Sequence, residues 1–315
     1  MTGLNLALGA MEFGSRIDEK ASFALLDQYV DAGGEWIDTA NCYAFWQNPS
    51  GHGGQSEELL GRWIAQRPGV RDRIKLATKV GCEPLHPGGY PAHVESLDQA
   101  GIDAALSTSL RRLGVDHVDL YWAHRDDRAT PLEETIGTFG RHVAAGTVGH
   151  IGLSNWALWR TERARAVAVG LGVEAPSYLQ LQYSYVRPRP LVADRTGGHR
   201  FGWLTDETID YATTDPNWNL WAYTPLMSGA YDRDDKSFPQ EYDHPGTTAR
   251  VETLAKVAAE LGVSRSSVVV AWLVGGTPAV RPIVGASRPE QLAASLEGAR
   301  LDLPGDVRAE LDKPW

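Results

Sequence analysis

The sequence predicts a closed (β/α)8 barrel, the TIM-barrel fold, on three observations. Short apolar segments alternate with amphipathic segments eight times along 315 residues, and such alternation is typical of a parallel sheet. The length is that of one such barrel, so we expect residues 1–315 to form a single domain. No Gly-x-Gly-x-x-Gly motif opens a helix after a strand, which disfavours an open dinucleotide-binding sheet.

Each element is predicted from the period of its apolar residues and from the residues that end it. The expected strands are 4–8, 35–40, 74–79, 118–124, 148–154, 177–184, 220–226 and 280–287. The expected helices are 19–32, one from Ser56, 101–113, 131–145, 156–170, 204–213, 248–261, one capped by Ser264, and 289–297. Ser56 and Ser264 are the expected N-caps, because a hydroxyl there can accept a free backbone N–H. A Pro- and Gly-rich loop is expected after the sixth strand.

Composition and charge exclude several classes of function. The net charge of −10 disfavours nucleic acid and anionic membranes as partners, because phosphate binding needs a basic face. Cys42 and Cys82 are too few and too far apart for a disulfide framework or a Cys-x-x-Cys metal site, so we expect a reducing compartment and no metal. No apolar run reaches the roughly 20 residues that span a bilayer, and no signal-peptide pattern begins the chain. We therefore expect a cytoplasmic protein, of an oligomeric state that the sequence does not predict.

The candidate site begins where the strand 35–40 runs into Tyr43. Asp38, Lys79 and His124 stand near the C-terminal ends of successive expected strands, where barrels carry their functional side chains. A buried lysine needs an acidic partner, so we expect Asp38 to pair with Lys79. The ammonium is expected to lower the pKa of the Tyr43 phenol from its usual value of roughly 10.

These four side chains suit the interconversion of a carbonyl and an alcohol. A phenol tuned in this way can protonate a carbonyl oxygen or deprotonate an alcohol, and His124 can orient that oxygen. The hydride must come from a cofactor, because no side chain supplies one. The alternative interpretation is structural: ion pairs such as Asp38–Lys79 often only stabilise a fold, and a lone histidine is often a core residue.

Seven segments carry a resemblance to a known family. They are Asp-Thr-Ala-Asn-Cys-Tyr, Ala-Thr-Lys-Val-Gly, Asp-Leu-Tyr-Trp-Ala-His, Gly-Leu-Ser-Asn, Gln-Leu-Gln-Tyr-Ser, Ala-Tyr-Thr-Pro-Leu and Val-Gly-Ala-Ser-Arg-Pro-Glu-Gln-Leu, in family order. The sequence thus resembles the aldo-keto reductase family over nearly its whole length. The resemblance implies a (β/α)8 barrel, hydride transfer between NADPH and a carbonyl, and a catalytic tetrad of Asp38, Tyr43, Lys79 and His124.

The resemblance also implies a nicotinamide cofactor site. Its expected residues are Gly9, Met11, Asp38, Ser154, Asn155, Gln180, Tyr223, Thr224, Pro225, Leu226, Ser228, Gly229, Gly285, Ser287, Arg288, Gln291 and Ser295. Arg288, beside a helix N-terminus, suits the 2′-phosphate of NADPH. Two departures stand out: Ala294 and Ser295 replace a Glu and an Asn that commonly contact adenine, which leaves NADH open. The usual N-terminal hairpin that plugs the barrel bottom is expected to be largely missing.

The substrate is predicted only by class. Tyr43, Trp46, Trp122, His124 and Trp156 are the expected substrate contacts. The loops 41–56 and 83–100 mix aromatic, amide and imidazole side chains, which favours a sugar-like or other polar carbonyl. Two other functions stay open: a nucleotide-sensing regulatory subunit, and an epimerase or eliminase that uses the cofactor transiently.

Overall fold

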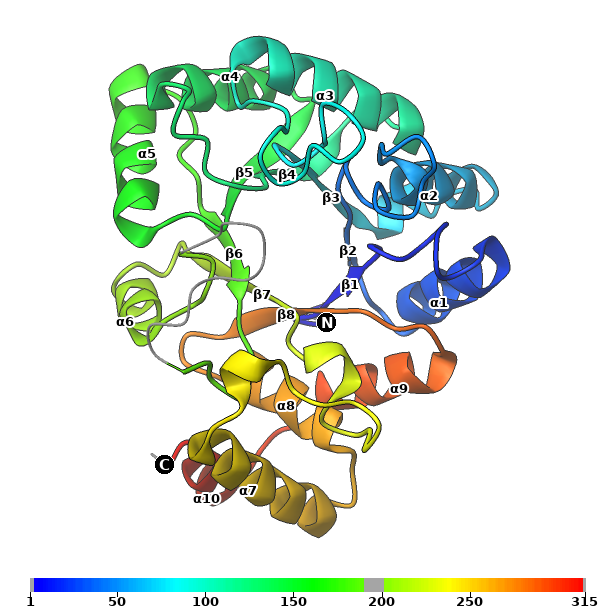
Figure 1. The fold of residues 1–315 in the computed structure, drawn as a ribbon, viewed down its shortest axis with the longest axis vertical. Helices are drawn as coiled ribbons and strands as arrows, with labels where there is room; N and C mark the ends of the chain where they lie inside the picture. The colour runs from blue at the N-terminus through cyan, green and yellow to red at the C-terminus, as the bar shows by residue number, and fades with distance from the viewer. Residues whose placement is uncertain (1–2, 190–200, 314–315) are drawn as a thin grey trace.

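Eight parallel strands close into a barrel in the computed structural model, which describes residues 3–189 and 201–313 (Figure 1). The strands pair in chain order, and β8 returns to β1. They are β1 (Ala7–Gly9), β2 (Trp36–Asp38), β3 (Lys75–Val80), β4 (Val118–Ala123), β5 (Val148–Ser154), β6 (Tyr178–Gln182), β7 (Asn219–Tyr223) and β8 (Val280–Val284). The predicted (β/α)8 fold is confirmed.

Helices surround the strands as an outer ring (Figure 1). They are α1 (Glu19–Asp31), α2 (Gln55–Ala65), α3 (Gln99–Leu113), α4 (Leu132–Ala144), α5 (Leu158–Leu171), α6 (Asp206–Thr214), α7 (Pro245–Leu261), α8 (Arg265–Val274), α9 (Pro289–Gly298) and α10 (Gly305–Leu311). Helix α10, which packs beside α7, was not predicted from the sequence. Part of the predicted loop after the sixth strand, residues 190–200, lies outside the described residues.

One of the two predicted helix caps is wrong. Ser264 caps α8 by accepting the backbone N–H of Ser267, as expected. Gly54, not Ser56, is the N-cap of α2, and Ser56 lies within the helix. The buried Ser56 hydroxyl donates to the Ala10 carbonyl and bonds to Thr39. It therefore ties α2 to the residues that follow the first two strands.

Tryptophan side chains fill the barrel interior below its C-terminal mouth. The Trp221 ring meets Trp36 and Trp122 edge to face, with centroid distances of 5.1 and 5.4 Å. The guanidinium of Arg281 lies over the rings of Trp36 and Trp221 at 5.6 and 5.3 Å, a cation–π arrangement. Residues 3–6, the described segment ahead of β1, contain no strand.

Two features of the described residues bear on other classes of function. No single helix there is long and apolar enough to cross a membrane; α7 and α8 pass that test only as a pair bent by 98°. Helix α8 is buried along most of its length, as a core helix is. Within residues 3–189 and 201–313, no group of three His, Cys, Asp or Glu side chains could hold a metal ion.

Candidate active site

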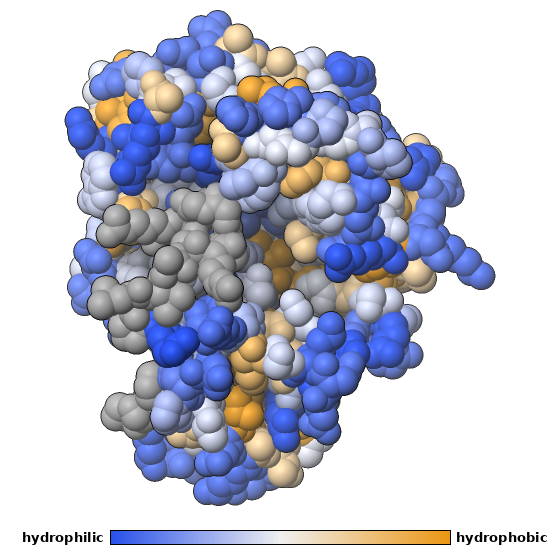
Figure 2. Space-filling model, in the orientation of Figure 1, coloured by the Kyte–Doolittle hydropathy of each residue, from blue (hydrophilic) through white to orange (hydrophobic). Residues whose placement is uncertain are grey.

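Strand alternation places Asp38 and Lys79 of the predicted tetrad on the inner surface of the barrel. Successive residues of a strand point to opposite faces, so Asp38 shares the inward face with Trp36, and His124 continues the inward row of Trp122. The His124 N–H donates to the Val80 carbonyl at 2.8 Å, which fixes the residue just beyond β4. Figure 2 shows a hollow with apolar residues in its depth over the middle of the strand ring.

The Lys79 ammonium is the centre of the site. Its Nζ lies 2.5 Å from Asp38 Oδ2, 2.7 Å from the Thr39 carbonyl and 2.8 Å from the Tyr43 hydroxyl. An ammonium has three N–H donors, and each of these three acceptors takes one. Lys79 is fully buried, and its charge is tolerated there because all three N–H donors of the ammonium have acceptors. The structure therefore brings Asp38, Lys79 and Tyr43 into one hydrogen-bonded unit.

The direction of the Tyr43 pKa corrects the sequence prediction. Burial of the hydroxyl raises the pKa of Tyr43 well above 10, and the Asp38 carboxylate raises it further. Burial also raises the pKa of Asp38 above 3.8, while Lys79 and Gln180 oppose that effect. The expected lowering by Lys79 does not prevail, because desolvation of the phenol is the larger effect and the Asp38 carboxylate opposes the ammonium charge. Tyr43 is thus a neutral phenol at physiological pH.

We therefore expect the Tyr43 phenol to ionise only in strong alkali. Subtracting the ultraviolet phenolate titration of Tyr43→Phe from that of the wild type should give a signal that appears well above pH 10. Because the folded pKa exceeds the unfolded one, this group favours the folded state below the unfolded pKa and loses that effect as pH rises. A difference signal between about pH 7 and 9 would contradict the assignment.

His124 completes the constellation on the side of β4. Its ring meets the Tyr43 ring edge to face at a centroid distance of 5.8 Å. Its Nδ1 lies 3.7 Å from the sulfur of Cys42, and its carbonyl accepts a hydrogen bond from the Asn155 amide at 3.0 Å. All four residues of the predicted tetrad therefore meet at one end of the barrel.

Sequence reasoning missed the carboxylate that ties the Tyr43 loop to β3. Glu95 accepts the Asn41 side-chain amide at 2.8 Å and the Gly81 backbone N–H at 2.6 Å. It also accepts the N–H groups of Cys82 and Glu83, both at 3.2 Å. Asn41 is two residues from Tyr43, and Gly81 is two residues from Lys79, so this contact helps to fix their separation. A buried acid in a long loop has no spacing that distinguishes it from a solvated one.

The Tyr43 loop also depends on a glycine of the following segment. A Cβ built on Gly53 would overlap the backbone of Cys42, so a larger residue would displace the loop. The Gly53 N–H donates to Glu83, and its carbonyl accepts from Arg112. Arg112 also pairs with the buried Glu57 of α2. The position of Tyr43 is therefore set from both sides of its loop.

The residues predicted to meet the nicotinamide carboxamide lie side by side around Asn155. Its side-chain amide donates to the Ser154 hydroxyl at 3.1 Å, and its oxygen accepts from the Tyr223 hydroxyl at 2.8 Å. The Gln180 amide donates to Asp38 at 3.2 Å, which links this group to the tetrad. Asn155 has φ +62°, a left-handed conformation that non-glycine residues adopt mainly at constrained sites.

The segment after β7 is the most unusual stretch of backbone in the described chain. Thr224, Met227 and Ser228 have positive φ values of 53°, 48° and 55°, and Gly229 has 91°. The buried Ser184 hydroxyl donates to the Pro225 carbonyl at 2.6 Å and holds the turn in place. Leu226 lies in the same turn. Left-handed backbone cradles anions in many proteins, which fits a turn beside a pyrophosphate.

The N-terminus of α9 provides a second place for an anion. Arg288 is its N-cap residue, no side chain caps the helix, and Arg288 and Ser287 are exposed there. The Gln291 side-chain oxygen accepts the Ser287 N–H and hydroxyl at 2.9 and 3.1 Å. An uncapped helix N-terminus with a neighbouring guanidinium suits a phosphate. These residues therefore fit the phosphorylated end of a nicotinamide dinucleotide.

Four further predicted cofactor residues differ in their placement. Gly285 is exposed beyond β8, where an added Cβ would meet nothing within 4 Å, and Met11 beyond β1 is 43% exposed. Gly9 ends β1, and a Cβ there would come within 3.0 Å of Ile283. Ser295 is buried, and its hydroxyl donates to the Gln291 carbonyl within α9. Ser295 therefore packs inside the molecule and does not face the open end of α9.

The three predicted substrate tryptophans lie in different environments. Trp46 is 41% exposed and meets the Tyr43 ring at 6.4 Å, so it borders the tetrad. Trp122 is fully buried in the barrel interior, beneath the mouth where it was expected. The sequence pattern is the same for a tryptophan at the end of a strand and for a tryptophan one or two residues before the end. The sequence therefore did not indicate how deep Trp122 lies in the barrel.

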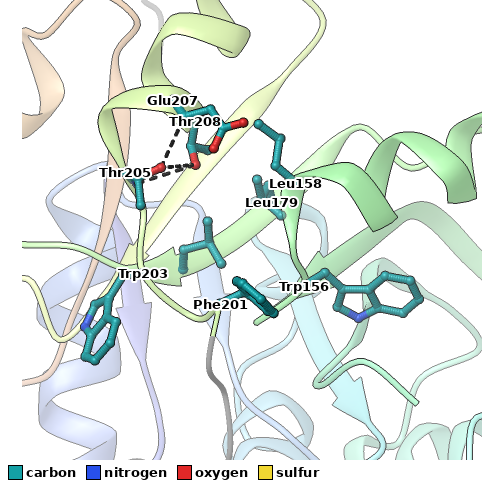
Figure 3. A pocket seen from close by; sticks show the side chains of 9 residues that line it. Trp156, Leu158, Leu179, Phe201, Trp203, Thr205, Glu207 and Thr208 are labelled. Atoms are coloured by element: carbon teal, nitrogen blue, oxygen red, sulfur yellow. Dashed lines mark hydrogen bonds between the residues drawn. The ribbon is translucent and has the colours of Figure 1, made fainter. Parts of the chain in front are cut away.

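Trp156 lines a pocket outside the barrel wall (Figure 3). Leu179 and Leu181 of β6 contribute to the same pocket, and they alternate with the inward-facing Gln180. The remaining lining residues are Leu158, Phe201, Trp203, Thr205, Glu207 and Thr208. Trp156 is therefore on the other side of the sheet from Lys79, not in the hollow at its mouth.

The comparison with known proteins agrees with the fold. A profile of the Aldo/keto reductase family matches residues 5–315, so the chain belongs to this family. It is 30% identical to the uncharacterized oxidoreductase YrpG of Bacillus subtilis (strain 168), over 97% of this chain and 91% of that protein. It is 27% identical to the aryl-alcohol dehydrogenase GME11368 of Pestalotiopsis microspora, over 98% and 78% of the two chains. It is 29% identical to the aldo-keto reductase yakc [NADP(+)] of Schizosaccharomyces pombe (strain 972 / ATCC 24843), over 90% and 79%. This family membership supports an oxidoreductase.

Proposed function

We propose that the protein is an NADPH-dependent carbonyl reductase that uses Tyr43 as its general acid and base. The observation that carries this proposal is the 2.8 Å contact between the Tyr43 hydroxyl and a buried ammonium that is itself paired with Asp38. A lysine held in this way orients the phenol and stabilises the phenolate that remains after a proton leaves. If the ion pair only stabilised the fold, the third N–H of the Lys79 ammonium would not need a phenol as its acceptor.

The reaction assigns a separate task to each residue. When bound, the reduced nicotinamide supplies the hydride. Tyr43 gives its proton to the carbonyl oxygen, and Lys79 with Asp38 limits the cost of the charge left on the phenol. His124 holds the same oxygen through a ring N–H. In the reverse direction Tyr43 takes the proton from the alcohol, so one site serves both reduction and oxidation.

NADPH is the cofactor that we expect the protein to prefer. Arg288 and the uncapped N-terminus of α9 provide the positive charge and donors that a 2′-phosphate needs. The name of the Schizosaccharomyces pombe relative also includes NADP(+). NADH stays an alternative, because Ala294 and Ser295 replace common adenine contacts and Ser295 is buried.

The surroundings of Tyr43 favour a carbonyl compound with a planar apolar body. Phe45 meets Trp46 and Tyr90 at centroid distances of 5.1 Å, and Trp46 meets Tyr43, so aromatic rings form a continuous chain beside the tetrad. Rings of this kind stack on flat substrates. This geometry favours an aryl aldehyde or ketone over the sugar-like carbonyl that the loop composition suggested.

A cofactor-oxidation screen tests the proposal. The purified protein is incubated with aromatic aldehydes, aromatic ketones and aldoses, with NADPH or NADH, and the reduced nicotinamide absorbance is followed. We expect turnover that is faster with NADPH and fastest with aromatic carbonyls. An Arg288→Gln variant should lose affinity for NADPH but not for NADH, which separates the 2′-phosphate contact from the rest of the site.

Two other outcomes would favour the alternative functions. Tight cofactor binding without turnover on any carbonyl would indicate a nucleotide-sensing regulatory subunit. Substrate conversion without net cofactor consumption would indicate an epimerase or eliminase. Either result would overturn the reductase proposal.

A further inference from the structure

A thiol touches the histidine that orients the substrate oxygen. The sulfur of Cys42 lies 3.7 Å from Nδ1 of His124, within the range of hydrogen bonds to sulfur. Cys42 is 2% exposed and packs with Ala40 and Cys82 beneath the Tyr43 loop. In a neutral histidine only one of the two ring nitrogens carries a proton, and hydrogen bonds to neighbouring groups decide which one. The contact with Cys42 therefore bears on which nitrogen of His124 is protonated.

The thiol is neutral in this environment. Burial raises the pKa of Cys42 well above 9.0, the carboxylates of Glu95 and Glu83 act in the same direction, and Lys79 opposes them. A thiolate–imidazolium pair, such as cysteine nucleophiles use, is therefore disfavoured. Two neutral arrangements remain: the thiol donates to a bare Nδ1, or an Nδ1–H group donates to sulfur. A bare imidazole nitrogen is the better acceptor of the two, because thiol sulfur accepts only weakly.

We propose that Cys42 is a positioning residue that donates its S–H to Nδ1 of His124 and thereby keeps the ring proton on Nε2. This inference rests on the proposed function, in which His124 donates a hydrogen bond to the carbonyl oxygen. The opposite tautomer would present a nitrogen lone pair to that oxygen and repel it. Cys42 thus selects the tautomer that the reaction needs without touching the substrate.

The tautomer can be observed directly in the full-length protein. In the wild type labelled with 15N-histidine, long-range 1H–15N spectra distinguish Nε2–H from Nδ1–H rings. The His124 signals are found among those of nine histidines by their absence in His124→Gln. We expect the Nε2–H form in the wild type and a mixture of tautomers in Cys42→Ala. Cys82→Ala is the matched control, because it creates a similar cavity in the same cluster, and it should leave the wild-type tautomer in place.

Activity provides an independent readout of the same variants. A hydrogen bond of ordinary strength corresponds to a change of roughly 2- to 10-fold, so kcat of Cys42→Ala should fall by about that factor with little change in cofactor affinity. An Nδ1–H tautomer in the wild type would overturn the proposal even if Cys42→Ala does not fold. An unchanged tautomer in folded Cys42→Ala would also overturn it. Because the spectra need no cofactor or substrate, they remain decisive if the reductase proposal fails.

Discussion

Replacing Tyr43 with phenylalanine is expected to lower turnover by roughly 10²–10⁴-fold, the range that a positioned general acid contributes. The change removes one hydroxyl, the group 2.8 Å from the Lys79 ammonium, and keeps the aromatic ring. No other described phenol shares that ammonium, so the proton would have to come from water or His124. The measurement is steady-state kcat with NADPH and the best carbonyl of the screen.

The controls for Tyr43→Phe are thermal stability and cofactor affinity, because the other contacts of the site should remain. Lys79 keeps its bonds to Asp38 and to the Thr39 carbonyl, and the ring keeps its contacts with His124 and Trp46. Thermal stability should therefore change little. Cofactor affinity, measured by quenching of tryptophan fluorescence, should stay within a few-fold of the wild type. Retention of wild-type turnover would remove the catalytic assignment of Tyr43.

Much of the fold follows from periodicity in the sequence. Strands of five to seven residues with alternating inward and outward side chains, such as β4 and β5, have boundaries close to the predicted ones. Once the barrel is accepted, strand alternation also places Asp38 and Lys79 on the same inner surface. Tyr43 lies in the loop after β2, so its place in the tetrad was predicted from its short distance along the chain to Asp38 and from the family resemblance.

Properties that depend on three-dimensional burial could not be predicted in this way. The expected effect of Lys79 on Tyr43 was reasoned from charge alone, whereas the pKa of Tyr43 is controlled first by desolvation. The depth of Trp122 depends on how closely β5 approaches, since a Cβ on Gly152 would overlap its ring. The contact of Glu95 with Gly81 joins a long loop to a strand end, and no local pattern encodes it.

Replacing Lys79 with methionine should have the largest effect on stability. The change leaves the buried Asp38 carboxylate without its cation, with the Gln180 amide as a remaining donor. Removing one member of a buried pair costs about 3–5 kcal/mol, because the partner charge stays desolvated. The free energy of unfolding from urea titrations at neutral pH measures this loss, and turnover should fall with it because Tyr43 loses its cationic neighbour.

A double variant and the pH dependence distinguish this explanation from simple loss of packing. In Lys79→Met, burial raises the pKa of Asp38 with less opposition than in the wild type. When the pKa of a carboxyl is higher in the folded than in the unfolded state, the free energy of unfolding of the protein falls as pH rises between the two values. Acidification should therefore return part of the lost stability. Adding Asp38→Asn removes the unpaired charge and should recover stability at neutral pH without restoring turnover. If the single variant were as stable as the wild type at neutral pH, the Asp38–Lys79 pair would not be the electrostatic centre that its geometry indicates.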